Sequence, residues 1–307
     1  MVYDLIIVGG GPAGITAGIY GARYRLKILM ITKDFGGQIA KKAVPIENYP
    51  GFKEISGLEL IQKFKEHLDK FKIDIEMDSV TKIEKNNENF QVLTEKGKKQ
   101  FESKTVIIAS GADPRPLKVP GEKEFVGRGV SYCVTCDAPV FKNKDVAVIG
   151  GGNAGFEAAI VLSHWAKKIY ILEYGEKVVA DIENQELAQK TGKVEIITSA
   201  ALKEIRGKNF VNSTIYQDRK SGENKMLKVE GVFVEIGLQP ASAFANDLVE
   251  FNERGEIKVD FETFQTKTPG LFAAGDVNVG KAKQIITACG EGAKAALAVA
   301  EYIRQLK

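Results

Sequence analysis

Two cysteines separated by two residues, Cys133 and Cys136, are the side chains of this sequence best suited to redox chemistry. The spacing lets the two sulfurs bond to each other, and CxxC thiols commonly have a lowered pKa. Asp137 follows directly, either as a turn residue or as a carboxyl that moves protons as thiol and thiolate interconvert. A redox-active dithiol fits this pair better than either alternative. A zinc site would need further ligands, and none has suitable spacing. A structural disulfide is disfavoured in a reducing cytosol.

Two glycine clusters form an internal repeat that organises the rest of the chain. Each cluster follows a short apolar run, at 3–8 and 145–149, and leads into a helix-like stretch, at 15–23 and 156–165. A second apolar run then follows, at 27–32 and 168–172. Continuous apolar runs of this length are typical of buried parallel strands. The sequence therefore predicts the order strand, glycine turn, helix, strand, twice.

The spacing Gly-x-Gly-x-x-Gly within each cluster has a physical reason. The first glycine allows a tight turn, the second lets backbone N–H groups approach a pyrophosphate, and the third lets the helix pack close to the strand. The helix N-terminus favours the phosphate charge. One such match can be an ordinary glycine turn, but two in the correct context indicate two dinucleotides, typically a flavin and a nicotinamide. The glycines are Gly9, Gly11 and Gly14, then Gly150, Gly152 and Gly155.

The length of 307 residues indicates about two domains. The stretches 111–116 and 237–240 follow strand-like runs and mark two seams, between which the whole second repeat lies. We therefore expect an α/β protein with two Rossmann-like domains, one inserted into the other. The discontinuous domain would span 1–112 and 245–307 and end in a helix at 285–306, and the inserted domain would span 113–244.

Composition excludes several other classes of protein. The net charge of +3 gives no electrostatic case for nucleic acid as the main partner. Three cysteines do not make a disulfide-stapled secreted scaffold, and two histidines nearly exclude a histidine-built metal site. The N-terminus lacks the pattern of a targeting signal, and no run approaches the ~18 apolar residues that span a bilayer. We expect a cytoplasmic protein with neither a metal site nor membrane contact.

These residues together resemble the low-molecular-weight thioredoxin reductases, which are FAD-dependent disulfide reductases. The glycine clusters are shared by many flavoproteins, whereas a CxxCD just before the second cluster is far more specific. The matching landmarks run almost end to end, at 9–14, 36–38, 46–52, 109–112, 127–131, 133–137, 150–155, 237–240, 269–276 and 283–285.

The resemblance implies two sets of cofactor-binding residues. The FAD set would cradle the pyrophosphate and line the flavin, and Asp276 would bind the ribityl chain. The helix that starts near 285 would point its N-terminus at the pyrimidine ring of the flavin. The FAD set is Gly9, Gly11, Pro12, Ala13, Gly14, Gly36, Gly37, Gln38, Asn48, Val80, Ala109, Gly111, Gly275, Asp276, Lys283, Gln284 and Ile285. The nicotinamide set is Gly150, Gly152, Asn153, Ala154, Gly155, Glu173 and Gly237.

The resemblance also divides the work between the cysteines. Cys136 would face the flavin, and Cys133 would attack a substrate disulfide to form a mixed disulfide that Cys136 resolves. Asp137 would be the acid–base group. The family rotates the inserted domain during turnover, so the two seams are candidate hinges, and its members are usually homodimers. Cys289 matches no catalytic position and is interpreted as a small buried residue of the last helix.

The choice of nicotinamide departs from the usual family pattern. NADPH-using relatives carry an arginine cluster after the second strand of this domain, whereas the stretch 172–181 contains no arginine. Glu173 lies close to the ~20-residue distance expected of an acid that binds the ribose 2′-hydroxyl, and its charge would repel a 2′-phosphate. Lys177 is the one cation here that could partly serve a phosphate. The stretch resembles the NADH-using flavoprotein subunit of alkyl hydroperoxide reductase, so we predict NADH over NADPH.

The leading interpretation is an enzyme that reduces the disulfide of thioredoxin or another small redoxin. A glutaredoxin-like or peroxiredoxin-system partner and a dithiol oxidase remain alternatives, although the intact second glycine cluster argues against the oxidase. A ferredoxin or flavodoxin reductase of similar fold would lack the CxxC. A non-catalytic redox-sensing module would show a damaged dithiol or a broken cluster.

Overall fold

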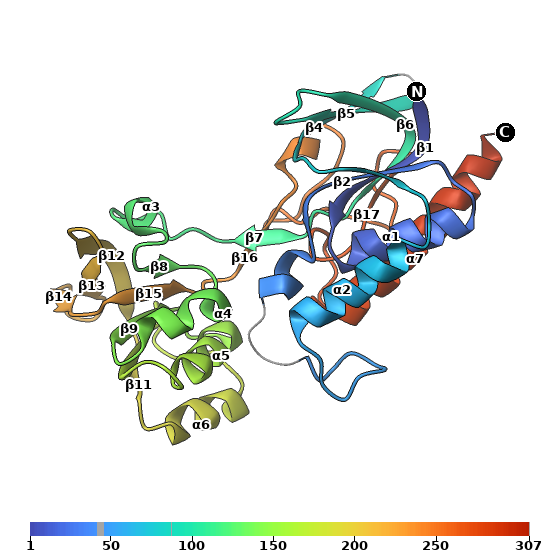
Figure 1. Cartoon of the computed structure of the whole chain (residues 1–307). Helices are drawn as coiled ribbons and strands as arrows, with labels where there is room; N and C mark the ends of the chain where they lie inside the picture. Colours follow the sequence, from blue (N-terminus) through green and yellow to red (C-terminus); the bar gives the residue numbers. More distant parts are fainter. Residues whose placement is uncertain (42–45, 87, 307) are drawn as a thin grey trace. The chain divides into compact units, whose positions relative to one another are not determined.

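The computed structural model describes residues 1–41, 46–86 and 88–306, except the side chains of Lys41, Thr135 and Cys136. The described chain divides into two compact units. Residues 1–40, 46–113 and 239–306 form the first unit, and residues 114–238 form the second (Figure 1). None of the helices in the described ranges is long and apolar enough to cross a membrane.

The first unit is built on a seven-stranded sheet whose central strand, β1, is apolar and buried on both faces. The strand order is β3-β2-β1-β6-β5-β4, and β17 also pairs with β6. All neighbours are parallel except the antiparallel pairs β4–β5 and β5–β6. The strands are β1 (Val2–Gly10), β2 (Ile28–Phe35), β3 (Asp74–Glu76), β4 (Val80–Asn86), β5 (Asn89–Thr94), β6 (Gln100–Ile108) and β17 (Leu271–Ala273).

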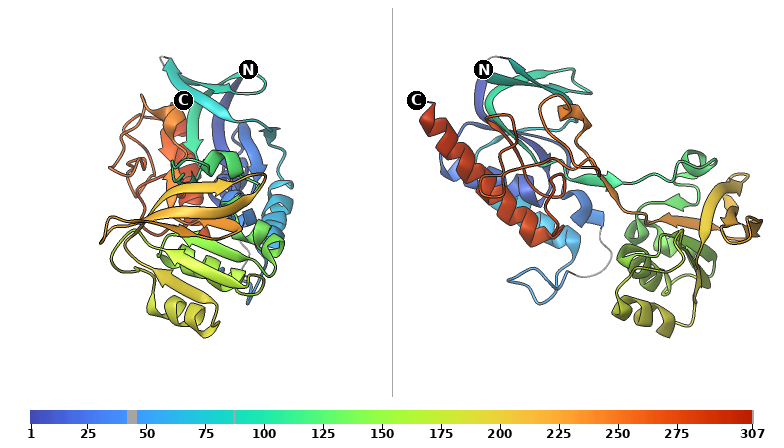
Figure 2. Two further views of the ribbon diagram at one scale, coloured as in Figure 1. Left: turned by 90° about the vertical axis from the view of Figure 1, so that its left-hand side faces the viewer. Right: turned by 180° about the vertical axis from the view of Figure 1, so that it is seen from behind.

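Three helices cover one face of this sheet, namely α1 (Pro12–Arg23), α2 (Gly57–Leu68) and α7 (Ile285–Gln305). Apolar residues of α1 and α7 share one core with the sheet, and Figure 2 shows the long red helix α7 beside α1. The other face packs against residues 244–259, which include the end of the short helix η3 (Ala243–Ala245). A further 3₁₀ turn, η1 (Gly37–Lys41), follows β2.

The second unit is a parallel five-stranded sheet of order β11-β10-β9-β15-β8. The helices α5 and α6 share a core with one face, and a three-stranded antiparallel sheet, β12-β13-β14, packs on the other. The strands are β8 (Val130–Ser131), β9 (Asp145–Ile149), β10 (Lys168–Leu172), β11 (Val194–Ile197), β12 (Ala200–Gly207), β13 (Val211–Asp218), β14 (Asn224–Leu227) and β15 (Gly231–Val234). The helices are α3 (Glu122–Phe125), α4 (Val134–Asp137), η2 (Ala138–Phe141), α5 (Asn153–Leu162) and α6 (Ile182–Lys190).

The chain passes between the two units twice, through β7 (Ala112–Pro114) and β16 (Leu238–Pro240), and these two strands pair with each other. The Arg115 N–H donates to the Gly237 carbonyl at 2.9 Å, and the Ala241 N–H donates to the Gly111 carbonyl at 3.1 Å. The predicted seams at 111–116 and 237–240 coincide with these strands, whereas the predicted return at 245 lies beyond β16.

Both helices of the repeat begin earlier than the apolar pattern predicts. The extended glycine of each cluster is the N-cap, so α1 starts at Pro12 and α5 at Asn153. The predicted end of the second helix at Trp165 is wrong, because α5 ends at Leu162. There the Trp165 N–H turns back to the Leu162 carbonyl, while the Trp165 carbonyl accepts from Asn143. The predicted C-terminal helix is confirmed as α7.

Alanine substitutions at two glycines of α7 should have opposite effects on the free energy of unfolding. A Cβ on Gly292 would overlap the backbone carbonyl of Ala13 in α1, whereas a Cβ on the exposed Gly290 would meet nothing within 4 Å. Gly292→Ala should lower the free energy of unfolding by about 1–3 kcal/mol, since the two helices must separate. Gly290→Ala should raise it by up to about 1 kcal/mol through helix propensity. Thermal unfolding of both variants checks this, and equal melting temperatures would contradict the close packing of α1 on α7.

Candidate functional site

The two glycine turns have the same backbone geometry at the carboxyl ends of their strands. Gly9 and Gly150 have φ values of +115° and +120°, in the region that favours glycine. A Cβ on Gly14 would overlap the Gly9 carbonyl oxygen, and a Cβ on Gly155 would overlap the Gly150 carbonyl oxygen. Only glycine at these positions lets each helix start this close to its strand.

The N-termini of α1 and α5 are open. Gly11 and Gly152 are the N-cap residues, and no side chain in the described part of the chain caps either helix. A Cβ on either glycine would meet no described atom within 4 Å. The first N–H groups of each helix can therefore bind a phosphate, which the helix dipole also favours. Each unit thus has one cradle that fits a dinucleotide pyrophosphate.

Glu173 follows β10 and folds over the second cradle. Its carboxylate accepts the Gly151 N–H at 2.7 Å and the Gly175 N–H at 2.5 Å. The two bonds fix a partly buried negative charge directly beside the glycine turn. Nearby, the Asn153 side chain at the start of α5 exchanges hydrogen bonds with Asp181, at 2.8 and 2.7 Å. The predicted nicotinamide residues of the glycine cluster and Glu173 therefore lie together, while Gly237 lies in the segment that leads to β16.

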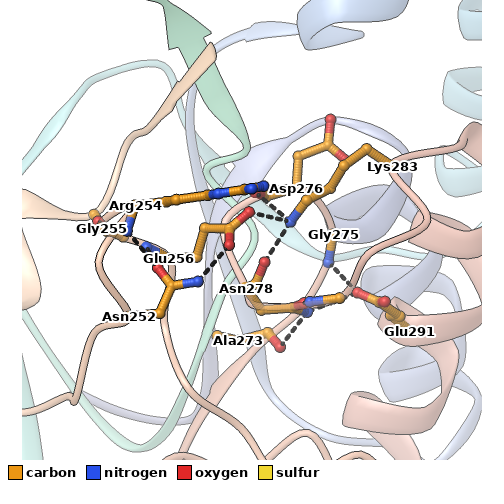
Figure 3. A network of polar contacts seen from close by, with 12 residues as sticks. Asn252, Arg254, Gly255, Glu256, Ala273, Gly275, Asp276, Asn278, Lys283 and Glu291 are labelled. Atoms are coloured by element: carbon orange, nitrogen blue, oxygen red, sulfur yellow. Dashed lines mark hydrogen bonds and ion pairs between the residues drawn. The ribbon is translucent and has the colours of Figure 1, made fainter. Parts of the chain in front are cut away.

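In the first unit, the turn that carries Gly275 and Asp276 is held by a buried carboxylate of α7 (Figure 3). Glu291 accepts the Gly275 N–H and the Asn278 side-chain amide, both at 2.7 Å. Burial raises the pKa of Glu291. Figure 3 shows the Asp276 carboxylate on the far side of the turn from the Asn278 side chain. The network therefore fixes the backbone of the turn that carries the carboxylate predicted to bind the ribityl chain.

The predicted cofactor residue Lys283 belongs to the same network. Its ammonium group donates to the carbonyls of Asp276, at 3.1 Å, and Asn278, and pairs with Glu256 at 3.1 Å (Figure 3). Through these contacts Lys283 links the segment just before α7 to the turn that carries Asp276. Glu291 and Glu256 were not found from the sequence, because no local motif connects either residue to the turn.

The remaining predicted FAD residues all lie in the first unit. Gln38 donates to the Ala112 carbonyl at 2.8 Å, and Asn48 donates to the Gln284 side chain at 3.2 Å. Val80 lies at the start of β4, partly buried against the core face opposite α1. The others lie just after the carboxyl ends of β2 and β6 or at the start of α7, namely Gly36, Gly37, Ala109, Gly111 and Ile285.

The CxxC segment leads into the short helix α4 of the second unit, which begins directly after Cys133. Cys133 is disulfide-bonded. Its N–H donates a hydrogen bond to the Ser131 hydroxyl at 3.0 Å, and its carbonyl accepts one from the Asp137 N–H at 3.2 Å. The side chain of Cys136 lies outside the described part of the structure. The partly buried Asp137 ends α4, so the predicted catalytic residues share one turn of backbone.

A buried carboxylate also fixes the segment that precedes the CxxC. Glu122 accepts the N–H groups of Leu117 and Lys118, both at 2.6 Å, and the Tyr132 hydroxyl. Burial and this carboxylate raise the pKa of Tyr132. The residue before Cys133 is thereby anchored to the segment that follows β7. No motif in the sequence signals this contact.

Cys289 is buried in α7, as predicted, and its thiol is free. The Tyr49 hydroxyl lies 3.8 Å from its sulfur, and burial beside this thiol raises the pKa of Tyr49 to about 12. Burial likewise raises the pKa of the Cys289 thiol, which disfavours the reactive thiolate.

Comparisons with known proteins agree with this arrangement. A family model described as pyridine nucleotide-disulphide oxidoreductase matches residues 3–292. A subunit of the alkyl hydroperoxide reductase of Staphylococcus aureus (strain NCTC 8325) is 44% identical over 303 residues, which are 98% of this chain. The aligned region is 59% of that relative, so the chain spans about three fifths of the curated relatives it matches.

Solved structures of similar fold cover almost the whole chain. Thioredoxin reductase of Lactococcus lactis, in its FR conformation, is 37% identical with a TM-score of 0.92, and 99% of each chain is covered. Thioredoxin reductase of T. acidophilum is 38% identical with a TM-score of 0.88, again over 99% of each chain. The predicted pair of Rossmann-like folds is confirmed by these likenesses and by the parallel strands at the centre of each of the two large sheets.

Glu235, directly after β15, gives the second cradle a pH-dependent stability. Burial and the nearby Glu157 carboxylate raise its pKa to about 7. At pH values between the ordinary glutamate pKa and 7, the Glu235 carboxyl is deprotonated in the unfolded chain and protonated in the folded chain. The free energy of unfolding therefore falls as pH rises through this range. Glu235→Gln should therefore raise the free energy of unfolding by about 2 kcal/mol at pH 8 and change it little near pH 4. Melting curves at both pH values test this, and an equal effect at both would contradict it.

Proposed function

Because this chain belongs to the pyridine nucleotide-disulphide oxidoreductase family, we propose that it reduces the disulfide of a small redoxin with NADH, using the Cys133–Cys136 pair. The observation that carries the proposal is the duplicated glycine cradle, one in each unit, together with a CxxC in the second unit. One dinucleotide cradle alone would serve a simpler dehydrogenase, whereas two cradles and a dithiol provide for a nicotinamide, FAD and a disulfide.

Members of this family use FAD and a nicotinamide cofactor, and both cradles fit such groups. FAD supplies the two-electron chemistry between nicotinamide and disulfide. The first cradle and the Gly275–Asp276 turn would hold it, with Glu291 and Lys283 fixing the turn. The domain assignment follows, with FAD on 1–112 and 245–307 and the nicotinamide on 113–244.

The redox pair does the substrate chemistry in our proposal. The Cys133 thiolate attacks one sulfur of the redoxin disulfide, the other sulfur leaves as a thiolate, and the Cys136 thiolate then displaces the redoxin from Cys133. The redoxin gains two electrons and the enzyme pair returns to the disulfide. Asp137, on the turn that follows, would supply and remove the protons.

NADH is favoured over NADPH by the position of Glu173. Two backbone N–H groups already hold its carboxylate, so its charge is fixed beside the second cradle. A ribose 2′-hydroxyl can donate to such a carboxylate, whereas a 2′-phosphate would be repelled by it.

A thioredoxin is the leading partner, because two solved structures that cover 99% of this chain, at 37% and 38% identity, are thioredoxin reductases. The 44% identity to an alkyl hydroperoxide reductase subunit favours a glutaredoxin-like or peroxiredoxin-system partner as the second candidate. A dithiol oxidase remains the third. A homodimer in the cytoplasm is part of the proposal by resemblance.

The nicotinamide preference is tested by kcat/KM with each cofactor. We expect wild type to favour NADH by at least about tenfold, which corresponds to about 1.4 kcal/mol. Glu173→Arg should move the ratio toward NADPH by at least about tenfold, since a repelling charge becomes an attracting one. Glu186→Arg makes the same charge change on an exposed position of α6 and should leave the ratio unaltered. Equal or better efficiency of wild type with NADPH would refute the preference.

The role of the dithiol is tested with serine variants under anaerobic conditions. Cys133→Ser and Cys136→Ser should each keep NADH-dependent bleaching of the flavin. Each should lower redoxin turnover by about 10³-fold or more, because a disulfide between positions 133 and 136 can no longer form. Cys289→Ala, which removes the third cysteine, should retain both activities. Redoxin turnover that persists in either serine variant would exclude the pair as the site.

A further inference from the structure

An arginine distant in sequence lies against the loop that carries Glu173. Arg219 begins the turn between β13 and β14, and its guanidinium carbon lies 3.8 Å from the centroid of the Tyr174 ring. Its Nη1 also donates to the Tyr174 carbonyl at 2.8 Å. The stretch 172–181 lacks arginine, yet the fold brings a cation to it from the antiparallel sheet.

The backbone around this pair is fixed on both sides. The Arg219 N–H donates to the Ser199 carbonyl, and the Ser199 N–H donates to the Gly175 carbonyl, both at 2.8 Å. The Asp218 carboxylate accepts the Lys220 N–H at 2.9 Å and pairs with Lys225 at 2.6 Å, which closes the turn. The guanidinium is therefore presented by a closed turn bonded to the Glu173 loop.

The Tyr174 ring remains open although the guanidinium covers one face. The residue is 63% exposed and is joined directly to Glu173, whose carboxylate is fixed beside the second cradle. In an adenine dinucleotide the base is bonded to the same ribose that carries the 2′-hydroxyl. A base whose ribose is held by Glu173 is thus within reach of the neighbouring ring. Flat aromatic and guanidinium surfaces stack on bases of any kind.

We propose that the Tyr174–Arg219 stack is the platform for the adenine of the nicotinamide cofactor. Tyr174 supplies the open aromatic face, and Arg219, which covers the other face, holds the ring in place. This inference rests on the proposed function in one respect, namely that Glu173 binds the ribose of the adenosine half. It adds two residues that set affinity for that half and leave the reacting nicotinamide untouched.

The direct test is calorimetric titration of the FAD-loaded enzyme with ADP-ribose, which carries the adenosine half and no nicotinamide. Tyr174→Leu and Arg219→Ala should each weaken binding about tenfold, the loss expected for one stacking contact. Tyr174→Phe, which keeps the ring, should bind as wild type does. Arg206→Ala, an exposed arginine paired only with Glu204 among the described contacts, is the matched control and should have no effect.

A kinetic comparison separates the platform from a general structural role. The two weakened variants should raise the half-saturating NADH concentration for flavin reduction about tenfold and leave the maximal rate unaltered. Reduced nicotinamide mononucleotide, which lacks adenosine, should react with all variants as with wild type. A parallel loss with both donors would overturn the proposal in favour of a structural role. A loss for NADPH alone would overturn it in favour of a phosphate contact.

The outcomes also distinguish this inference from the proposed function. If NADH fails to reduce the flavin of wild type, the proposed function fails. If NADH reduces it but ADP-ribose does not bind, or binds the variants as tightly as wild type, the adenine platform alone is refuted.

Discussion

Both cradles depend on a backbone contact that only glycine permits, the approach of the third glycine of each cluster to the carbonyl of the first. Gly14 lies against Gly9 and Gly155 against Gly150, and in each case a Cβ would overlap the carbonyl oxygen. The contact brings the helix start to the end of its strand, so the uncapped N–H groups open directly beyond the sheet. The apolar strands and the covering helices serve to hold this approach in place.

Carboxylates fixed by backbone N–H groups are the second recurring device. Glu173 accepts two such groups beside the second cradle, and Glu122 accepts two beside the CxxC segment. Glu291 accepts the Gly275 N–H together with an amide side chain. Oriented N–H dipoles offset part of the cost of burying a carboxylate charge. Each one also ties a loop to a rigid element, which is the geometric requirement of a binding site.

The sequence predicted what is encoded over short distances. Strands β9 and β10 match their predicted bounds because apolar runs between polar residues define buried strands, and the glycine turns were found from their spacing. Contacts across the fold could not be predicted. Arg219 lies 45 positions from Tyr174, and Glu291 lies 16 positions from Gly275 with no motif that pairs them. Predicted helix ends were also wrong where a residue outside the helix determines the end. At Trp165, for example, the carbonyl accepts a hydrogen bond from the Asn143 N–H.

The Arg219 contact sharpens what the absence of a local arginine cluster means. A free guanidinium near the ribose would attract a 2′-phosphate and offset the repulsion from Glu173. Arg219 instead stacks on a ring and donates to a carbonyl, so its plane and one of its donors are already engaged. Among the described residues Glu173 has backbone partners rather than a cation, since its oxygens accept from Gly151 and Gly175. The fold thus places a positive group on Tyr174, the residue that follows Glu173. In the proposed function, in which Glu173 binds the ribose, the charge of this carboxylate favours a hydroxyl over a phosphate.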